Sequence, residues 1–370
     1  MAKRLVVCCD GTWDTAEQPY KTNVTKVAES VRPGLADGKD QRVYYGSGVG
    51  TRRFERYRGG AFGEGLSENV MDAYRFLVGT YEPGDELFFF GFSRGAFTAR
   101  SLAGLVRNSG ILRQGEAGRI KEAWTLYRDR NEQPGGAAAT AFRRSYAHET
   151  EIHFIGVWDT VGALGIPPLG PRWTKPLANL FDRRYAFHDT QLSSWVKGAF
   201  QALAIDETRS PFEPTLWHQQ PGAAQQGQEL KQNWFSGVHT DIGGGYKESG
   251  LSDITLMWIV DQARRYGLEF DDEVLGVADP SGTKPGKNID FHVLPDALST
   301  LHDSRKGMYR LTKPVHRPIG RAADDKGRPD GDEFVASTAK ERYDKAADYR
   351  PPELERYLAD TGRVRLDQVA

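Results

Sequence analysis

Residues 87–100 read LFFFGFSRGAFTAR, and the pentapeptide Gly91-Phe92-Ser93-Arg94-Gly95 stands at the centre of this run. The apolar residues before it, Leu87–Phe90, are typical of a buried strand, and those from Ala96 to Val106 have helical spacing. A serine between two glycines at a strand-to-helix junction is the pattern of a nucleophile elbow, a turn too sharp for flanking side chains. The stretch therefore predicts a reactive Ser93 at the end of a central strand; a serine that merely caps the helix is the alternative.

The rest of the chain alternates expected strands with expected helices. This alternation predicts an α/β protein with a mostly parallel central sheet and helices on both faces, and the elbow favours the α/β-hydrolase fold. Apolar runs predict strands at Leu5–Cys9, Val43–Tyr45, Glu86–Phe92, Ile152–Trp158, Asn233–Val238 and Ile289–Val293, and helical spacing predicts helices at Leu66–Tyr81, within 94–130, at Lys197–Ile205 and at Asp253–Tyr266.

We expect residues 1–325 to form one catalytic domain. Within it, residues 163–195 are rich in proline and aromatic residues and show little periodicity, which indicates a lid-like insertion. Residues 326–370 are charged and polar, and we expect them to be an extension that packs on the domain or trails from it.

Chemically useful side chains follow four of the expected strands. Asp10, Ser93, Asp159 and the His239-Thr240-Asp241 run each come directly after a strand. Ligands of an open parallel sheet bind outside the carboxyl ends of its strands. The sequence therefore predicts that one serine, one histidine and three carboxylates meet at one edge of the sheet.

This set of residue types is the one that nucleophilic acyl transfer requires. A histidine takes the proton of the serine, and a carboxylate orients the imidazole. Ser93, Asp159 and His239 follow the chain order serine, acid, histidine of α/β-hydrolases. A competing assignment takes Asp241 as the acid and His302 or His316 as the base. Asp241 also has a structural interpretation, as an acceptor for N–H groups of the glycines at 243–245.

Two backbone N–H groups are needed to stabilise an oxyanion. One is expected from Arg94, at the start of the helix after Ser93. The other is expected from Gly11 or Thr12, because the loop after the first strand lies beside the nucleophile and its glycine lets the backbone approach a substrate.

Composition excludes several other functions. The net charge of −1 gives no sign of nucleic-acid binding. The two cysteines, Cys8 and Cys9, are neighbours on opposite faces of an expected strand, so neither a disulfide nor a cysteine metal site is expected. The glycine-rich residues 46–50 lack a phosphate-loop ending, and no second ligand lies at metal-binding spacing near His239, so we expect no cofactor and no metal. No stretch is long and apolar enough for a transmembrane segment, and no signal peptide precedes the first strand, which predicts a cytoplasmic protein.

Several separated motifs together resemble a known family. The chain is similar, over about residues 4–320, to a bacterial and fungal hydrolase family long catalogued as a domain of unknown function, which includes the catalytic domain of class 1 type VI secretion lipase effectors. The motifs that carry the resemblance are CDGTW at 9–13, YGSGVGT at 45–51, GDELFFFGFSRGAFTARS at 84–101, WDTVG at 158–162, AIDETR at 204–209 and WFSGVHTDIGGGY at 234–246.

The resemblance implies an α/β-hydrolase core with a Ser-Asp-His triad at Ser93, Asp159 and His239. It implies phospholipase A or lipase activity on acyl esters, transient contact with a membrane and export by a type VI system. The alternatives are a small-molecule carboxylesterase or thioesterase, and a catalytically silent binding module. Asp206 and Arg209 belong to the family pattern, and we expect them to form a structural ion pair near the site.

Overall fold

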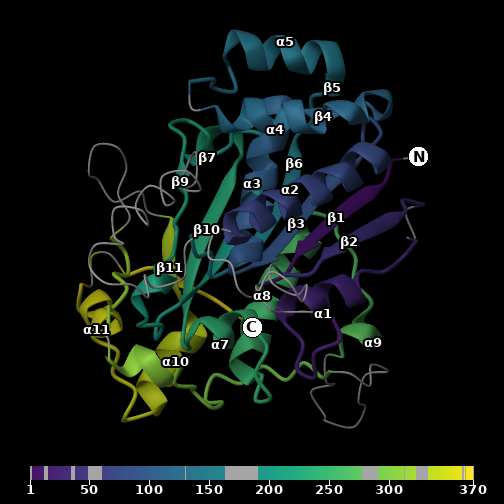
Figure 1. Ribbon diagram of the computed structural model, residues 1–370. Helices are drawn as coiled ribbons and strands as arrows, with labels where there is room; N and C mark the ends of the chain where they lie inside the picture. Colours follow the sequence, from purple (N-terminus) through teal and green to yellow (C-terminus); the bar gives the residue numbers. More distant parts are fainter. Residues whose placement is uncertain are drawn as a thin grey trace.

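An eight-stranded sheet forms the centre of the molecule (Figure 1). Its strand order is β12-β11-β10-β8-β6-β3-β1-β2, and every pairing within it is parallel. The expected α/β architecture is therefore confirmed. The computed structural model describes residues 2–11, 16–34, 38–48, 61–129, 131–162, 191–276, 291–311, 313–321, 332–360, 362 and 364–369.

The strands of the large sheet come from the whole length of the chain. They are β1 (Arg4–Cys9), β2 (Gln41–Gly46), β3 (Glu86–Phe92), β6 (Ile152–Trp158), β8 (Val196–Ala204), β10 (Glu229–Phe235), β11 (Glu333–Ala336) and β12 (Leu366–Asp367). Two small pairs lie outside it, antiparallel β4 (Ile111–Leu112) with β5 (Ala147–His148) and parallel β7 (Gln191–Leu192) with β9 (His218–Gln219).

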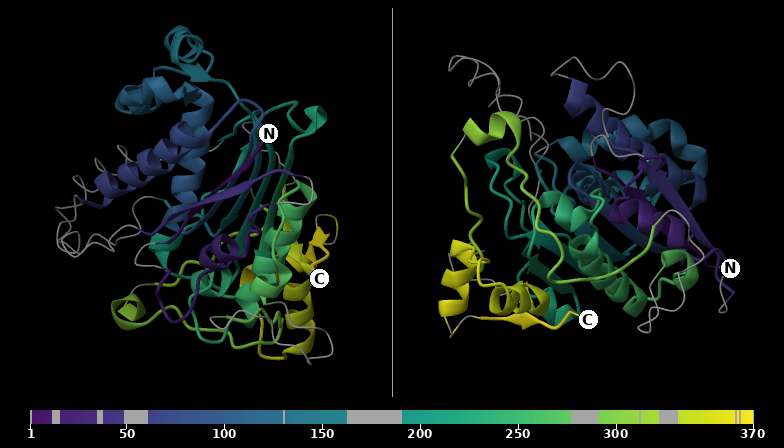
Figure 2. Two further views of the ribbon diagram at one scale, coloured as in Figure 1. Left: turned by 90° about the vertical axis from the view of Figure 1, so that its right-hand side faces the viewer. Right: turned by 90° about the horizontal axis from the view of Figure 1, so that it is seen from below.

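Helices cover both faces of the sheet, as the left view of Figure 2 shows. One hydrophobic core joins one face to α2 (Ala61–Thr80), α3 (Arg94–Ser109) and α4 (Ile120–Arg128). A second joins the other face to α1 (Asn23–Ser30) and α8 (Gly250–Arg265). The other α-helices of the described residues are α5 (Ala137–Tyr146), α7 (His239–Gly243), α9 (Asp272–Leu275), α10 (Ser337–Lys345) and α11 (Pro352–Ala359).

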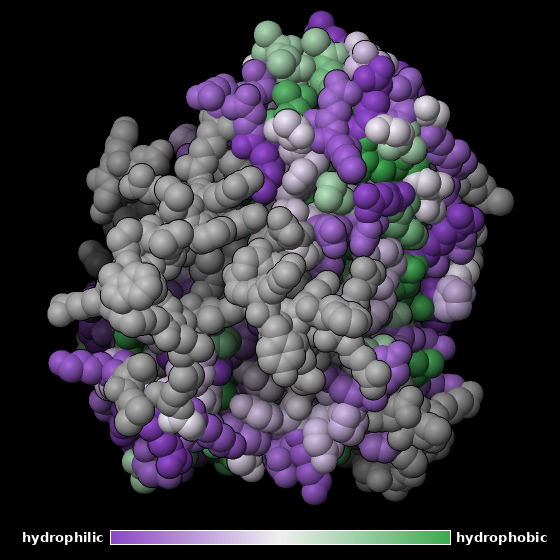
Figure 3. All heavy atoms as spheres, viewed as in Figure 1, coloured by the Kyte–Doolittle hydropathy of each residue, from purple (hydrophilic) through white to green (hydrophobic). Residues whose placement is uncertain are grey.

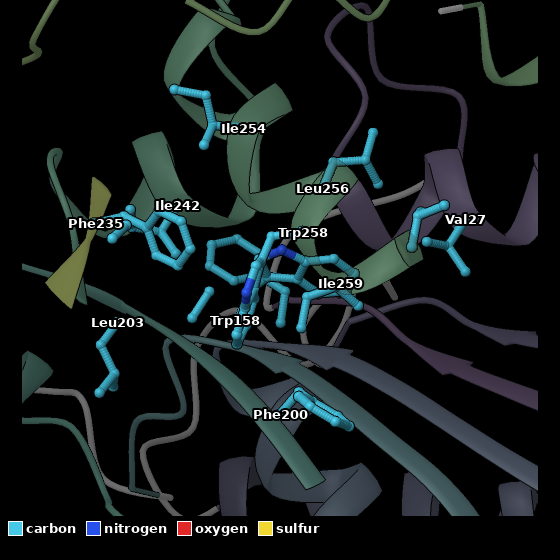
Figure 4. Packing of buried hydrophobic residues seen from close by; sticks show 14 of the residues in the cluster. Val27, Trp158, Phe200, Leu203, Phe235, Ile242, Ile254, Leu256, Trp258 and Ile259 are labelled. Atoms are coloured by element: carbon cyan, nitrogen blue, oxygen red, sulfur yellow. The ribbon is translucent and has the colours of Figure 1, made fainter. Parts of the chain in front are cut away.

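Alternation along the strands divides side chains between the two cores. Cys8 lies in the core with α1 and α8, whereas Cys9 lies in the core with α2 and α3. The two side chains therefore lie on opposite faces of the strand, as predicted. In Figure 4, Trp158 and Phe200 of the sheet face Trp258 and Ile259 of α8. The Phe200 and Trp258 rings meet edge-on at 6.1 Å between centroids. This aromatic packing fixes α8 against the middle of the sheet.

The prediction of a helix at Lys197–Ile205 is wrong, because these residues form the central strand β8. Neighbours on both sides and helices on both faces bury it almost completely, so it lacks the polar–apolar alternation of a half-exposed strand. Its three alanines and absence of β-branched residues after Val196 favour a helix locally. Tertiary packing overrides that local preference.

The carboxyl-terminal residues contribute two strands that the sequence did not predict. β11 pairs with β10, and β12 pairs with β11. The strand expected at Ile289–Val293 is not found: residues 289–290 lie outside the described residues, and 291–293 belong to no strand of the sheet. Of the expected lid-like insertion at 163–195, residues 163–190 lie outside the described residues.

Hydrophilic residues predominate over the described surface in the view of Figure 3, with a small hydrophobic group at the top over α5. No helix in the described part of the chain combines the length and apolarity that a membrane span requires.

Candidate active site

Ser93 lies in a sharp turn between β3 and α3. Its backbone has φ 58° and ψ −118°, a conformation that L-residues rarely adopt. A Cβ on Gly91 would lie 2.5 Å from the Gly95 carbonyl oxygen, and a Cβ on Gly95 would overlap the carbonyl groups of Cys9 and Asp10. Both glycines are thus required by the close approach of strand and helix, as the elbow pattern predicts.

His239 begins α7, separated by three residues from the end of β10, and its imidazole lies between Ser93 and Asp159. Nε2 is 2.8 Å from Ser93 Oγ, and Nδ1 is 2.6 Å from Asp159 Oδ2. All three side chains are buried. The Phe92 and Phe212 rings pack against the imidazole at 4.7 and 4.9 Å between centroids. The structure therefore brings the first set of candidate residues together in hydrogen-bonding order.

Asp159 follows β6 in a left-handed conformation, with φ 43°. Its Oδ1 accepts a hydrogen bond from the Ala204 N–H at 3.1 Å. Arg317, which the sequence gave no reason to select, donates to both oxygens, from Nη1 to Oδ1 at 2.7 Å and from Nη2 to Oδ2 at 3.0 Å. The carboxylate thus has a partner on every side, although it is fully buried.

The environment perturbs the protonation of both groups. Burial lowers the pKa of His239 below its ordinary 6.5, although the hydrogen bond to Asp159 opposes this effect. Burial alone would raise the pKa of Asp159, but the charge of Arg317 and the hydrogen bond to His239 outweigh it and hold that pKa well below 3.8. At neutral pH the site therefore holds a neutral imidazole beside an ionised carboxylate.

The expected oxyanion donors are only partly placed. Arg94 is the first residue of α3, so its N–H lies at the helix N-terminus next to Ser93. The Gly11 N–H donates to Asp10 Oδ1 at 2.8 Å, so the expectation that it points to a substrate disagrees with this structure. The Asp10 carboxylate also accepts from Thr22, Thr25 and Tyr45, which fixes its position. Thr12 lies outside the described residues.

The residues of the competing assignment lie together but apart from Ser93. His302 Nδ1 is 2.6 Å from Asp241 Oδ1, and the His302 ring stacks on Tyr246. Ser93 is bound by His239 instead. His316 is exposed. The structure thus brings Asp241 and His302 together as a second pair, without contact to the serine.

The structural role expected for Asp241 needs correction. Its Oδ2 accepts from the N–H groups of Val238 at 3.1 Å and His302 at 3.3 Å, rather than from the glycines at 243–245. It therefore links the start of α7 to the segment that carries His302.

The Asp206–Arg209 ion pair also needs correction. Arg209 binds Glu207 instead, with Nη2 2.7 Å from Oε2 and Nε 2.9 Å from Oε1. Asp206 Oδ2 accepts from the Gly237 N–H at 2.7 Å and from the Tyr349 hydroxyl at 2.9 Å. Asp206 and its neighbour Glu207 therefore bind different partners.

Glu207 is a buried carboxylate that the sequence did not single out. It accepts from the His239 N–H at 3.3 Å and from Ser304 Oγ at 3.1 Å, in addition to Arg209. It lies three residues after β8, near two other strand ends with acidic residues, but the sequence did not reveal this place because it predicted a helix where β8 lies. Among the described residues, no group of acidic, histidine or cysteine side chains has the arrangement of a metal site.

Comparison with known proteins gives remote relatives and one family. An uncharacterised protein of Saccharomyces cerevisiae is 31% identical over an alignment of 244 residues, and the match covers 59% of this chain and 33% of that protein. The chain thus spans about a third of that relative.

Two solved structures also match. An uncharacterised protein from Pseudomonas aeruginosa has 16% identity and a TM-score of 0.37, covering 73% of this chain and 46% of that one. The Tle1 effector bound to the VgrG spike of the type VI secretion system has 21% identity and a TM-score of 0.36, covering 67% and 52%. Residues 3–262 match the type VI secretion family described as "Phospholipase effector Tle1-like, catalytic domain", and the chain belongs to that family.

Proposed function

We propose that the protein is a serine hydrolase that cleaves acyl ester bonds of phospholipids. The observation that carries this proposal is the hydrogen-bonded series from Ser93 through His239 to Asp159, with distances of 2.8 and 2.6 Å. Membership in a phospholipase effector family supports a lipid substrate. Transient contact with a membrane and export by a type VI system belong to the same proposal.

In the proposed reaction, Ser93 Oγ attacks the ester carbonyl while His239 Nε2 takes its proton. The Arg94 N–H stabilises the oxyanion that forms, and His239 then protonates the departing alcohol. Water attacks the acyl-enzyme by the same route in reverse order. Asp159 holds the tautomer in which Nε2 is free to accept a proton, and its charge stabilises the imidazolium.

Labelling by a fluorophosphonate probe and lipid hydrolysis test this function. The wild-type protein should be labelled at Ser93 and should release fatty acid from phosphatidylcholine or phosphatidylglycerol vesicles. Ser93→Ala should fold normally and lose both properties.

The same experiments separate the alternatives. Labelling with a preference for short, soluble p-nitrophenyl or thioester substrates over vesicles would indicate a small-molecule esterase or thioesterase. A folded wild-type protein that is not labelled at all would indicate a binding module and would contradict the proposal.

A further inference from the structure

Arg317 is a buried arginine that contacts the candidate site from outside the matched family region. Its side chain is 3% exposed, and it lies well beyond residue 262. Besides both oxygens of Asp159, its guanidinium donates to the backbone carbonyls of Ala204, at 2.9 Å, and Phe212. Arg317 thus joins the carboxylate on one side of His239 to the backbone of the residue whose ring packs on the imidazole.

The segment that carries Arg317 binds one carboxylate near the end of each of three neighbouring strands. Arg317 binds Asp159 after β6, Ser304 binds Glu207 after β8, and His302 binds Asp241 after β10. The Val315 N–H also donates to the Thr208 carbonyl at 3.0 Å. Only the Arg317 contact reaches a carboxylate that directly binds the His239 imidazole.

We propose that Arg317 is a positioning residue for the proposed hydrolysis: it fixes the Asp159 carboxylate and tempers the negative charge that this carboxylate presents to His239. The inference rests on the proposed function for its catalytic meaning. The two hydrogen bonds from the Arg317 guanidinium hold the Asp159 carboxylate in one orientation, in which Oδ2 faces His239 Nδ1. An isolated carboxylate would instead present its full charge to the imidazole.

Several charged groups face His239. Asp159 and Glu207, from the ends of β6 and β8, favour the protonated imidazole, whereas Arg317 disfavours it. Arg209 is paired with Glu207, and Asp241 on α7 with His302. Arg317 is the cation that binds Asp159, and Asp159 in turn binds the His239 imidazole. Removal of Arg317 should therefore raise the pKa of His239. The acid limb of the pH–rate profile should then move to higher pH together with the pKa of His239.

The test compares kcat/KM against pH for the wild type, Arg317→Met, Arg317→Lys and Arg342→Met. Arg342 is the matched control, because it is also buried and donates to two backbone carbonyls, of Ala297 and Ser299, without contact to Ser93, His239 or Asp159. Arg317→Met should shift the acid limb by about one unit to higher pH and lower kcat more than it changes KM. Arg342→Met should lower the melting temperature and leave the limb in place.

Arg317→Lys separates charge from geometry and covers the case in which Arg317→Met does not fold. Lysine keeps the charge but not the forked contact, so the acid limb should stay near its wild-type position while kcat falls. A wild-type kcat in this variant would overturn the proposal. The proposal would also be overturned if the pH–rate profile of Arg317→Met matched that of the wild type while its melting temperature fell as it does in Arg342→Met.

A readout without turnover distinguishes this inference from the proposed function. The His239 imidazole is titrated by NMR in the wild type and in Arg317→Met. If Ser93 is not labelled and no ester is cleaved, the proposed function fails, yet an upward shift of the His239 titration would still support the action of Arg317 on the imidazole. An unshifted titration would overturn it.

Discussion

Ser93 and Asp159 are the two residues other than glycine with positive φ in the described part of the chain, at 58° and 43°. Such conformations cost about 1–3 kcal/mol each and persist only where the surrounding structure imposes them. Both residues belong to the candidate triad. The strain is therefore located at two of the candidate catalytic residues.

The strain at Ser93 predicts different stabilities for two inactive variants. Glycine adopts positive φ without steric cost, whereas alanine retains the strain. Ser93→Gly should therefore be more stable than Ser93→Ala by about 1 kcal/mol, offset in part by the greater flexibility of the unfolded glycine variant. Urea denaturation of both variants measures the difference. Equal or reversed stabilities would show that the turn imposes no cost on a side chain.

The two histidine-bound aspartates predict opposite outcomes when they are replaced. Asp159→Asn removes the charge that supports the imidazolium and should lower kcat by about 10³-fold or more, in a protein that still folds. Asp241→Asn weakens contacts to Val238 and His302 only, and should lower the free energy of unfolding by about 1–2 kcal/mol with turnover retained. Ester hydrolysis and thermal melts of both variants are compared. A reversal of the two phenotypes would assign the acid to Asp241.

Asp206 predicts a pH-dependent stability. Burial raises the pKa of Asp206 from 3.8 to about 6, despite its hydrogen bonds to Gly237 and Tyr349. Because the folded state binds the proton more tightly, the stability that Asp206 contributes is complete below pH 3.8 and is lost as pH rises through 6. Asp206→Asn stays neutral, and its single oxygen can accept both hydrogen bonds, since both reach Oδ2 in the wild type.

We therefore expect Asp206→Asn to be more stable than the wild type by about 1–2 kcal/mol at pH 8, and the difference to disappear near pH 4. Urea unfolding at both pH values measures it. A difference that does not vary with pH would contradict the shifted ionisation of Asp206.

Single residues also show what the sequence can reveal about the site. Ser93, Asp159 and His239 are recognisable because each directly follows a strand, where a parallel sheet collects its functional groups. Arg317 has no such local pattern. Its contact joins residues 158 positions apart, and only the completed fold brings them together.

At the scale of elements, the junction between β3 and α3 depends on a close approach to β1. A methyl group on Gly95 would overlap the backbone at Cys9 and Asp10, which cannot move without disturbing the sheet. Gly95→Ala should therefore cost about 3 kcal/mol or more and abolish turnover. Circular dichroism melts and fluorophosphonate labelling measure both effects.

Gly79, on α2, is the matched control, because a Cβ there would meet nothing within 4 Å. Gly79→Ala should leave activity unchanged and raise stability by up to about 1 kcal/mol. If Gly95→Ala were as harmless as Gly79→Ala, the elbow would be less tightly packed than the structure indicates.

The elements differ in how well the sequence predicts them. The strand before Ser93 is recognisable from its run of phenylalanines, and the helix after it from its spacing. β8 is not recognisable, because burial on both faces removes the alternation and its alanines favour a helix. β11 and β12 are short, and polar residues flank them, so their pairing depends on the edge that β10 provides for β11 and that β11 provides for β12.

At the scale of the whole molecule, Asp367 ties the last strand to the rest of the sheet. Its carboxylate accepts from Trp258 Nε1 at 2.8 Å, Lys231 Nζ at 2.9 Å and Asn233 Nδ2 at 3.1 Å. Asp367→Ala leaves these donors without that partner, and should cost about 2–3 kcal/mol while the protein still melts in one transition. Leu366→Ala, at a neighbouring exposed side chain, should have little effect.

Thermal melts and limited proteolysis of the two variants measure this coupling. A separate early transition in Asp367→Ala would show that the carboxyl-terminal residues melt independently of the sheet, contrary to the continuous strand order.

The late position of Arg317 has a consequence for the timing of synthesis. A ribosome completes Ser93, Asp159 and His239 several seconds before it adds Arg317, because translation proceeds at about 5–20 residues per second. The strands β11 and β12, which complete one edge of the sheet, emerge later still. A nascent chain therefore carries the three candidate groups before it carries the arginine that orders them, and we expect competence for catalysis to appear only after Arg317 is added rather than when His239 is added.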